Sequence, residues 1–126
     1  MTHENLFDHP GERTPDDYPS LDALREARRL ARERAARTAA LEVLRSLRRR
    51  GVHAGVFGSL ASGRFRLHSD VDFLVLECPP ALRYRIEAKI EDRMRGIPFD
   101  VAYADEMREP WRSRALAGLR DESTLR

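Results

Sequence analysis

The chain has 126 residues, of which 41% are hydrophobic, which is enough for one small domain with its own core. No apolar run approaches the roughly 20 residues that cross a bilayer, and residues 1–19 lack the apolar segment of a signal peptide. A single cysteine excludes an internal disulfide framework and a cysteine-rich zinc site. We therefore expect a cytoplasmic protein without a membrane contact.

The formal net charge of +2 hides an uneven distribution along the chain. Residues 1–24 sum to −5 and residues 25–50 to +7, while the remainder is close to neutral. Residues 1–19 are acidic, contain three prolines and show little periodicity. These features predict a flexible N-terminal tail followed by a basic segment.

Residues 20–50 are predicted to form one long basic helix. Ser20 suits the N-cap position, and Gly51 follows the last helical residue as a stop signal. Residues at steps of three or four predict an amphipathic face made of Leu21, Leu24, Ala27, Ala31, Ala35, Thr38, Leu41, Leu44 and Leu47. A helix of about thirty residues would be roughly 45 Å long, which exceeds the width of so small a domain. We expect residues 41–47 to pack on the domain and the earlier turns to project or to meet a partner.

Residues 51–126 are predicted to form the rest of a small domain. Short strands are expected at 52–57, 71–76 and 99–103, with a helix at 80–95 whose face is Leu82, Ile86, Ile90 and Met94. A final helix is expected from Asp105 to about Leu116, followed by a polar end that frays. This order predicts a mixed α/β (α+β) fold, with a small mixed β-sheet flanked by helices and a long N-terminal helix.

The segment 58–72, GSLASGRFRLHSDVD, carries the chemistry. Gly58 and Ser59 end the first strand and open a short helical turn, where free backbone N–H groups favour phosphate. Asp70 and Asp72 enter the second strand two residues apart, so they share one face about 6–7 Å apart. Adjacent carboxylates repel unless a cation lies between them. A pair of Mg²⁺ ions about 3.5–4 Å apart would fit and could clamp a phosphoryl displacement.

A third carboxylate, Asp100, lies between Phe99 and Val101 in the third predicted strand. An apolar strand is a costly place for an unpaired charge. If this strand neighbours the second one, Asp100 completes a three-carboxylate site. The candidate catalytic and metal-binding residues are therefore Asp70, Asp72 and Asp100.

These residues resemble the signature of a known superfamily. Gly58-Ser59, ten further residues and then Asp70-Val71-Asp72 resemble the G-S-x10-D-x-D pattern of the DNA polymerase beta-like nucleotidyltransferases. The stretches GSLASG at 58–63 and SDVDFLV at 69–75 resemble the minimal nucleotidyltransferases (MNT) in particular, and FDV at 99–101 resembles their third-carboxylate strand. The resemblance covers about residues 41–105, which together carry the predicted core.

The resemblance implies a nucleotidyltransferase fold and the transfer of AMP from ATP with two Mg²⁺ ions. Asp70 and Asp72 would hold both ions, and Asp100 would hold the ion nearer the attacking oxygen. Gly58, Ser59 and Ser69, together with nearby backbone amides, would bind the nucleotide.

The resemblance also implies a partner, because minimal nucleotidyltransferases are often antitoxins paired with HEPN-domain ribonucleases. Some of them silence the toxin by adenylylating a tyrosine. We therefore expect the antitoxin of a toxin–antitoxin system, acting as a protein adenylyltransferase (AMPylation) on a HEPN-type toxin. A core this short is expected to need a macromolecule that brings its own acceptor.

Several alternatives stay open at this stage. The chain could be a non-catalytic antitoxin that neutralises by complex formation, or an inactive member that keeps the fold. It could also transfer nucleotides to a small molecule or to RNA. For the basic helix, a solvated face or an acidic partner is favoured over nucleic acid, since acidic residues interrupt it and no aromatic residue is interleaved. The oligomeric state is open.

Overall fold

The computed structural model describes residues 18–125, so most of the predicted tail 1–19 lies outside the described residues. The elements in chain order are α1 (Leu21–Arg49), β1 (His53–Phe57), α2 (Ser59–Ser62), β2 (Val71–Glu77), η2 (Pro80–Arg85), α3 (Ile86–Met94), β3 (Phe99–Tyr103), η3 (Ala104–Glu106) and α4 (Trp111–Ala117). The predicted mixed α/β fold class is confirmed, including the long N-terminal helix. No helix in the described part is both long and apolar enough to span a membrane.

The sheet has three strands in the order β1-β2-β3. β1 pairs antiparallel with β2, and β2 pairs parallel with β3. Their register places Phe57 opposite Asp72, and Asp72 opposite Asp100. The expectation that the third strand neighbours the second is thereby confirmed.

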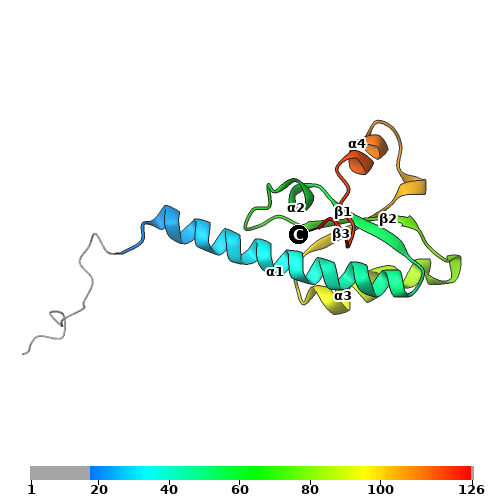
Figure 1. The fold of residues 1–126 in the computed structure, drawn as a ribbon, viewed down its shortest axis with the longest axis horizontal. Helices are drawn as coiled ribbons and strands as arrows, with labels where there is room; N and C mark the ends of the chain where they lie inside the picture. Colours follow the sequence, from blue (N-terminus) through cyan, green and yellow to red (C-terminus); the bar gives the residue numbers. More distant parts are fainter. Residues whose placement is uncertain (1–17, 126) are drawn as a thin grey trace, which may run out of the picture.

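Helices cover both faces of the sheet, with α1 and α3 on one side and α4 on the other (Figure 1). The larger core cluster joins α1 and α3 to alternate residues of β2, namely Val71, Phe73 and Val75. A smaller cluster beneath α4 contains Leu74, Ala104 and Ala115. Because side chains alternate along a strand, Asp72 lies on the same face as Leu74, which is the face that α4 partly covers.

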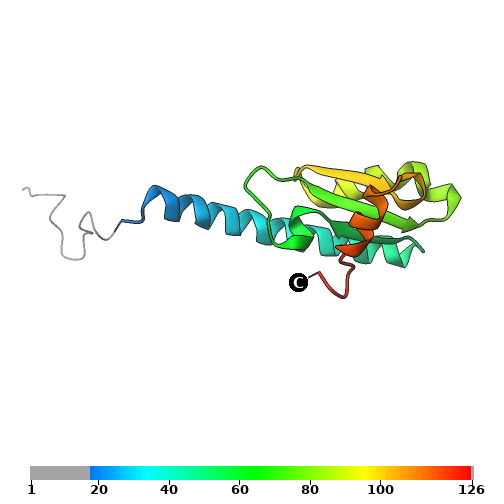
Figure 2. The same cartoon turned by 90° about the horizontal axis from the view of Figure 1, so that it is seen from above.

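Helix α1 begins as predicted and runs unbroken for 29 residues. The Ser20 hydroxyl accepts a hydrogen bond from the Ala23 amide at 3.0 Å, which is the expected N-cap contact. The first turns extend beyond the rest of the molecule (Figures 1 and 2). Leu21 is 69% exposed, and the first buried residue of α1 is Ala36. The expectation that the earlier turns project is therefore confirmed.

The predicted face of α1 was wrong in its middle part. Ala35 and Thr38 are exposed, whereas the buried residues are Ala36, Ala39, Ala40, Val43, Leu44, Ser46 and Leu47. Each step of three residues falls about 60° short of a full helical turn, so a series built on such steps drifts around the helix. Leu44 and Leu47 are buried and the partly buried Leu41 packs against the core, so residues 41–47 pack on the domain as expected. The predicted residues before Leu41 do not follow the observed face.

The two later helices start further along the chain than predicted. Residues 80–85 form the 3₁₀ helix η2, and the α-helix begins at Ile86. Residues 104–106 form the separate turn η3, and α4 begins at Trp111, directly after Pro110. Proline has no backbone N–H and disfavours helical geometry at the residue before it, so α4 cannot extend back to Asp105.

The C-terminal segment does not fray as predicted. Leu125 is 1% exposed and belongs to the larger core cluster. The Asp121 carboxylate accepts hydrogen bonds from the backbone amides of Ser123 and Thr124 at 2.9 and 3.1 Å, which closes a turn. An ion pair of 2.9 Å joins Glu122 to Arg48 near the end of α1. The buried leucine, the closed turn and the ion pair together hold the segment on the domain.

Candidate active site

The site starts where β1 ends, at Gly58. This residue has a φ of +73°, a backbone conformation that favours glycine. A Cβ atom built on it would overlap the Oδ2 atom of Asp72, because the two strands are paired at that point. Only a glycine therefore allows the backbone before α2 to lie directly against the Asp72 carboxylate.

Helix α2 follows at once, as the glycine–serine pair predicted. Ser59 is its first residue and is half-buried, and Leu60 is fully buried in the core beneath it. The buried leucine fixes the short helix on the sheet, so Ser59 is held directly after Gly58, whose backbone lies against Asp72. The structure thus brings Gly58 and Ser59 to the carboxylate predicted to work with them.

The three predicted carboxylates lie near one another. Asp72 is half-buried, whereas Asp70 and Asp100 are exposed. Burial raises the pKa of Asp72 to about 6, and the negative charges of Asp100 and then Asp70 add to the effect. The sensitivity of Asp72 to both charges identifies the three groups as one electrostatic cluster at this edge of β2 and β3.

Nothing in residues 18–125 neutralises this cluster, since no ion pair there involves any of the three carboxylates. Within the same residues no three His, Cys, Asp or Glu side chains are already arranged around a common metal position. The donor set itself consists of hard carboxylate oxygens, which are the ligands that Mg²⁺ prefers. A divalent cation therefore fits the chemistry of the cluster, provided that the exposed side chains turn toward it.

The loop before Asp70 is held in place by a buried side chain and by two hydrogen bonds. Phe65 is fully buried, and the Arg29 side chain of α1 donates a hydrogen bond to the Phe65 carbonyl at 2.9 Å. The Ser69 hydroxyl accepts a hydrogen bond from the Arg66 amide at 2.8 Å. Ser69 thus helps to close the turn that leads into β2, and its nucleotide contact stays a prediction.

A comparison with known families decides the class of the chain. Residues 38–120 match the model of the nucleotidyltransferase domain. The chain belongs to the nucleotidyltransferase domain family. A solved structure described as a proposed minimal nucleotidyltransferase shares its fold, with 24% sequence identity and a TM-score of 0.53. The match covers 82% of this chain and 97% of the other, while a search of curated proteins gave no match.

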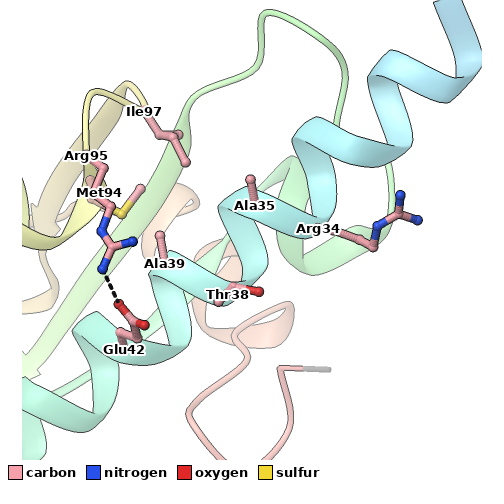
Figure 3. Close-up of a pocket in the computed structure, with 8 residues that line it drawn as sticks. All are labelled: Arg34, Ala35, Thr38, Ala39, Glu42, Met94, Arg95 and Ile97. Atoms are coloured by element: carbon pink, nitrogen blue, oxygen red, sulfur yellow. Dashed lines mark ion pairs between the residues drawn. The ribbon is translucent and has the colours of Figure 1, made fainter. Parts of the chain in front are cut away.

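One hollow of this nucleotidyltransferase lies away from the carboxylates. It has a volume of about 490 Å³ and lies between α1 and the end of α3 (Figure 3). Thr38 and Ala39 line one side, Met94 and Ile97 the other, and Arg95 approaches Glu42 to 4.0 Å. It contains none of the predicted site residues, so we assign it no part in the site.

A second hollow shares Gly58 with the surroundings of Asp72. It has a volume of about 530 Å³, begins at Gly58 and is bounded by α2 and by the end of α4. Arg114 and Arg120 line it, and neither was predicted as a site residue. The sequence could not single out these two residues, because the chain contains so many arginines. Gly55 could have indicated that a further segment packs against β1, because a glycine inside a strand often marks the close approach of another backbone.

Proposed function

We propose that this nucleotidyltransferase moves AMP from ATP to a hydroxyl group of a partner protein, with two Mg²⁺ ions. The observation that supports this proposal is the unneutralised cluster of Asp70, Asp72 and Asp100 beside the glycine–serine turn. Three carboxylates in so small a volume are unfavourable without a cation. A metal–nucleotide complex would supply that cation and place the phosphates beside α2.

The residues have separate roles in the proposed reaction. Asp70 and Asp72 would hold the metal ions, and bound Mg²⁺ would offset the charge that develops on the phosphates. The acceptor oxygen forms a bond to the α-phosphorus, and the bond from that phosphorus to the bridging oxygen of the β-phosphate breaks. Pyrophosphate leaves with the electron pair. Asp100, exposed on β3, takes the proton of the acceptor hydroxyl and passes it to solvent.

Alignment supplies most of the rate in such a site. The carboxylates and the glycine–serine turn lie on or next to paired strands, so their backbone positions are fixed before the substrate arrives and only the exposed side chains have to turn toward the metal. Replacement of any metal-holding aspartate by asparagine should therefore nearly abolish transfer. Family membership supports nucleotidyl transfer in general, and the motif resemblance to minimal nucleotidyltransferases supports the finer assignment.

For the acceptor we propose a tyrosine of a HEPN-type toxin, which makes the chain an antitoxin. The support is the resemblance of residues 58–63 and 69–75 to minimal nucleotidyltransferases. The projecting turns of α1 expose Leu21, Leu24 and Leu30 beside an arginine-rich surface, which suits a protein partner.

The experiment compares three acceptors in parallel with α-labelled ATP and Mg²⁺. The acceptors are a purified HEPN-type protein, total RNA and a panel of aminoglycosides. Label on a tyrosine of the HEPN-type protein, located by mass spectrometry, is the expected result. Label on RNA or on the aminoglycosides alone would refute the protein acceptor while preserving nucleotidyl transfer.

A second candidate function is neutralisation of the toxin by binding alone, which the exposed leucines of α1 favour. Leu24→Glu combined with Leu30→Glu should then abolish neutralisation, while Asp70→Asn, Asp72→Asn and Asp100→Asn should leave it intact. The catalytic proposal predicts that each aspartate substitution abolishes neutralisation. Both sets of variants can be scored by the growth of cells that express the toxin.

A further inference from the structure

The hollow next to Gly58 has one wall made by α2 and another made by the C-terminal part of the chain. We call it the arginine slot, and its lining residues are Gly58, Ala61, Ser62, Arg114, Ala117, Gly118, Leu119 and Arg120. Its volume of about 530 Å³ lies within the range of small-molecule binding sites. Because Gly58 also contacts Asp72, the slot and the carboxylate cluster share one boundary residue.

Both arginines of the slot are available for a ligand. In the described part of the chain, neither Arg114 nor Arg120 forms an ion pair with a carboxylate. The Arg114 guanidinium lies 5.1 Å from the centre of the Trp111 ring. Stacking on an aromatic ring leaves the edge N–H groups of a guanidinium free to donate hydrogen bonds.

The backbone position of Arg120 is fixed by the sheet. Its amide donates to the Val56 carbonyl and its carbonyl accepts from the Val56 amide, both at 2.8 Å. Gly55 permits this approach, because a Cβ atom there would lie 2.8 Å from both the Arg120 carbonyl oxygen and the Leu119 side chain. Backbone hydrogen bonds thus hold Arg120 next to β1.

The slot and Asp100 lie on opposite sides of Asp72. The slot adjoins β1, Asp72 belongs to the central strand β2, and Asp100 belongs to β3. A ligand that spans this region meets carboxylates at one end and guanidinium groups at the other. A nucleoside triphosphate with bound metal would suit this charge order, because the metal would face the carboxylates and the phosphate oxygens that bind no metal would face the guanidinium groups.

We propose that the arginine slot binds the β- and γ-phosphates of the nucleoside triphosphate, with Arg114 and Arg120 as the residues that hold them. The proposal rests on the proposed nucleotidyl transfer and adds two contacts from the C-terminal part of the chain. The departing pyrophosphate carries the electron pair of the broken bond, and the two guanidinium groups stabilise that charge. The acceptor then approaches from the β3 side, where Asp100 lies.

The test compares Arg114→Gln, Arg120→Gln and the double variant with the wild-type chain. Arg45→Gln is the matched control, because Arg45 is exposed on α1 and lines no part of the slot. Calorimetric titration with Mg-ATP should show the Kd raised about tenfold or more in the double variant and unchanged in the control. Pyrophosphate should lose its competition with Mg-ATP in the double variant. AMP, which lacks both terminal phosphates, should bind the variants and the wild type equally.

Unchanged Mg-ATP affinity in the double variant would overturn the proposal, and so would an equal loss of AMP and ATP affinity. Thermal unfolding of each variant identifies any affinity loss that comes from a disrupted fold, and Arg114→Lys with Arg120→Lys should restore part of the affinity. If the double variant binds ATP normally while the wild type transfers nucleotide, the phosphate-binding role of the slot is refuted and the proposed function is retained. If the affinity for ATP falls while that for AMP does not, but no acceptor becomes labelled, the phosphate-binding role is retained and the proposed function is refuted.

Discussion

Gly58 and Asp72 are in a contact that a glycine alone permits, since any Cβ atom at residue 58 would overlap the Asp72 carboxylate. The contact joins the turn before α2 to the central strand, and thus joins the predicted nucleotide-binding residues to the predicted metal ligands. A substitution at this glycine would have two effects, namely backbone strain from the positive φ of +73° and a clash with the Asp72 carboxylate. A second glycine with a positive φ but with no close neighbour separates the two effects.

Gly58→Ala should abolish nucleotidyl transfer and destabilise the fold by more than about 1 kcal/mol, because a Cβ atom both strains the backbone and displaces Asp72. Gly96→Ala is the control, since Gly96 has a φ of +85° and no heavy atom within 4 Å of its Cβ position. The control should lose about 1 kcal/mol of stability and keep its activity. Equal activity in the two variants would show that the contact with Asp72 has no functional importance. Thermal unfolding and a transfer assay check both variants.

The raised pKa of Asp72 predicts an unusual pH dependence of stability in metal-free protein. Between pH 4 and pH 6 the folded chain keeps a proton on Asp72 that the unfolded chain has lost, so the contribution of Asp72 to stability falls as the pH rises through this window. Asp72→Asn should therefore be more stable than wild type above pH 6, by on the order of 1 kcal/mol after solvent screening. The two should converge below pH 4. Urea unfolding in EDTA at several pH values measures the difference.

Asp92→Asn on α3 is the control for that series, because Asp92 is exposed and lies outside the carboxylate cluster. The gain in stability above pH 6 that is expected of Asp72→Asn should be absent from this variant. A stability difference between Asp72→Asn and the wild type that does not grow from pH 4 to pH 6 would contradict the assignment of a raised pKa to Asp72.

A bound divalent metal ion should offset the repulsion among the three carboxylates and thereby stabilise the folded chain. At pH 7.5 the addition of Mg²⁺ at ten times its Kd should stabilise the wild type by about 1.4 kcal/mol, and EDTA should remove the effect. Asp72→Asn should lose this response, whereas Asp92→Asn should retain it. An identical response in both variants would place the metal elsewhere. Differential scanning fluorimetry with Mg²⁺ and Mn²⁺ makes the comparison directly.

The two halves of α1 should respond differently to the same substitution. Leu44 is 2% exposed and lies in the core, so Leu44→Ala should cost about 2–4 kcal/mol of unfolding free energy. Leu30 is 39% exposed on the projecting half, so Leu30→Ala should change stability by less than about 0.5 kcal/mol. Urea unfolding of both variants checks the pair. A large cost at Leu30 would mean that the projecting turns are packed in solution, for example against a second copy.

The parts of the fold that local rules control could be predicted from the sequence. The N-cap at Ser20, the third strand at 99–103 and the short helix after Gly58 all follow from capping, alternation and glycine geometry. The predicted face of α1 failed in the middle because steps of three drift from the helical repeat. The buried Leu125 was missed because a single apolar residue in a polar segment has no period to reveal it.

Some residues of the candidate site could likewise be predicted from the sequence, and others could not. Asp70 and Asp72 are two residues apart, so strand geometry alone predicts that they share one face, and the glycine–serine pair predicts the short helix that begins at Ser59. The position of Asp100 depended on a strand pairing that the sequence could only suggest, and the register of β2 with β3 supplies it. Arg114 and Arg120 reach the site through the path of the C-terminal segment, which no local pattern specifies.

The most direct test of the account is label transfer from α-labelled ATP to the partner protein by four matched variants. The wild type and Asp92→Asn should transfer label in Mg²⁺ and stop in EDTA. Asp70→Asn, Asp72→Asn and Asp100→Asn should each lose at least about a hundredfold in rate while they remain folded. Transfer at the wild-type rate by Asp72→Asn would contradict the three-carboxylate site, and neutralisation of the toxin without any label would contradict catalysis.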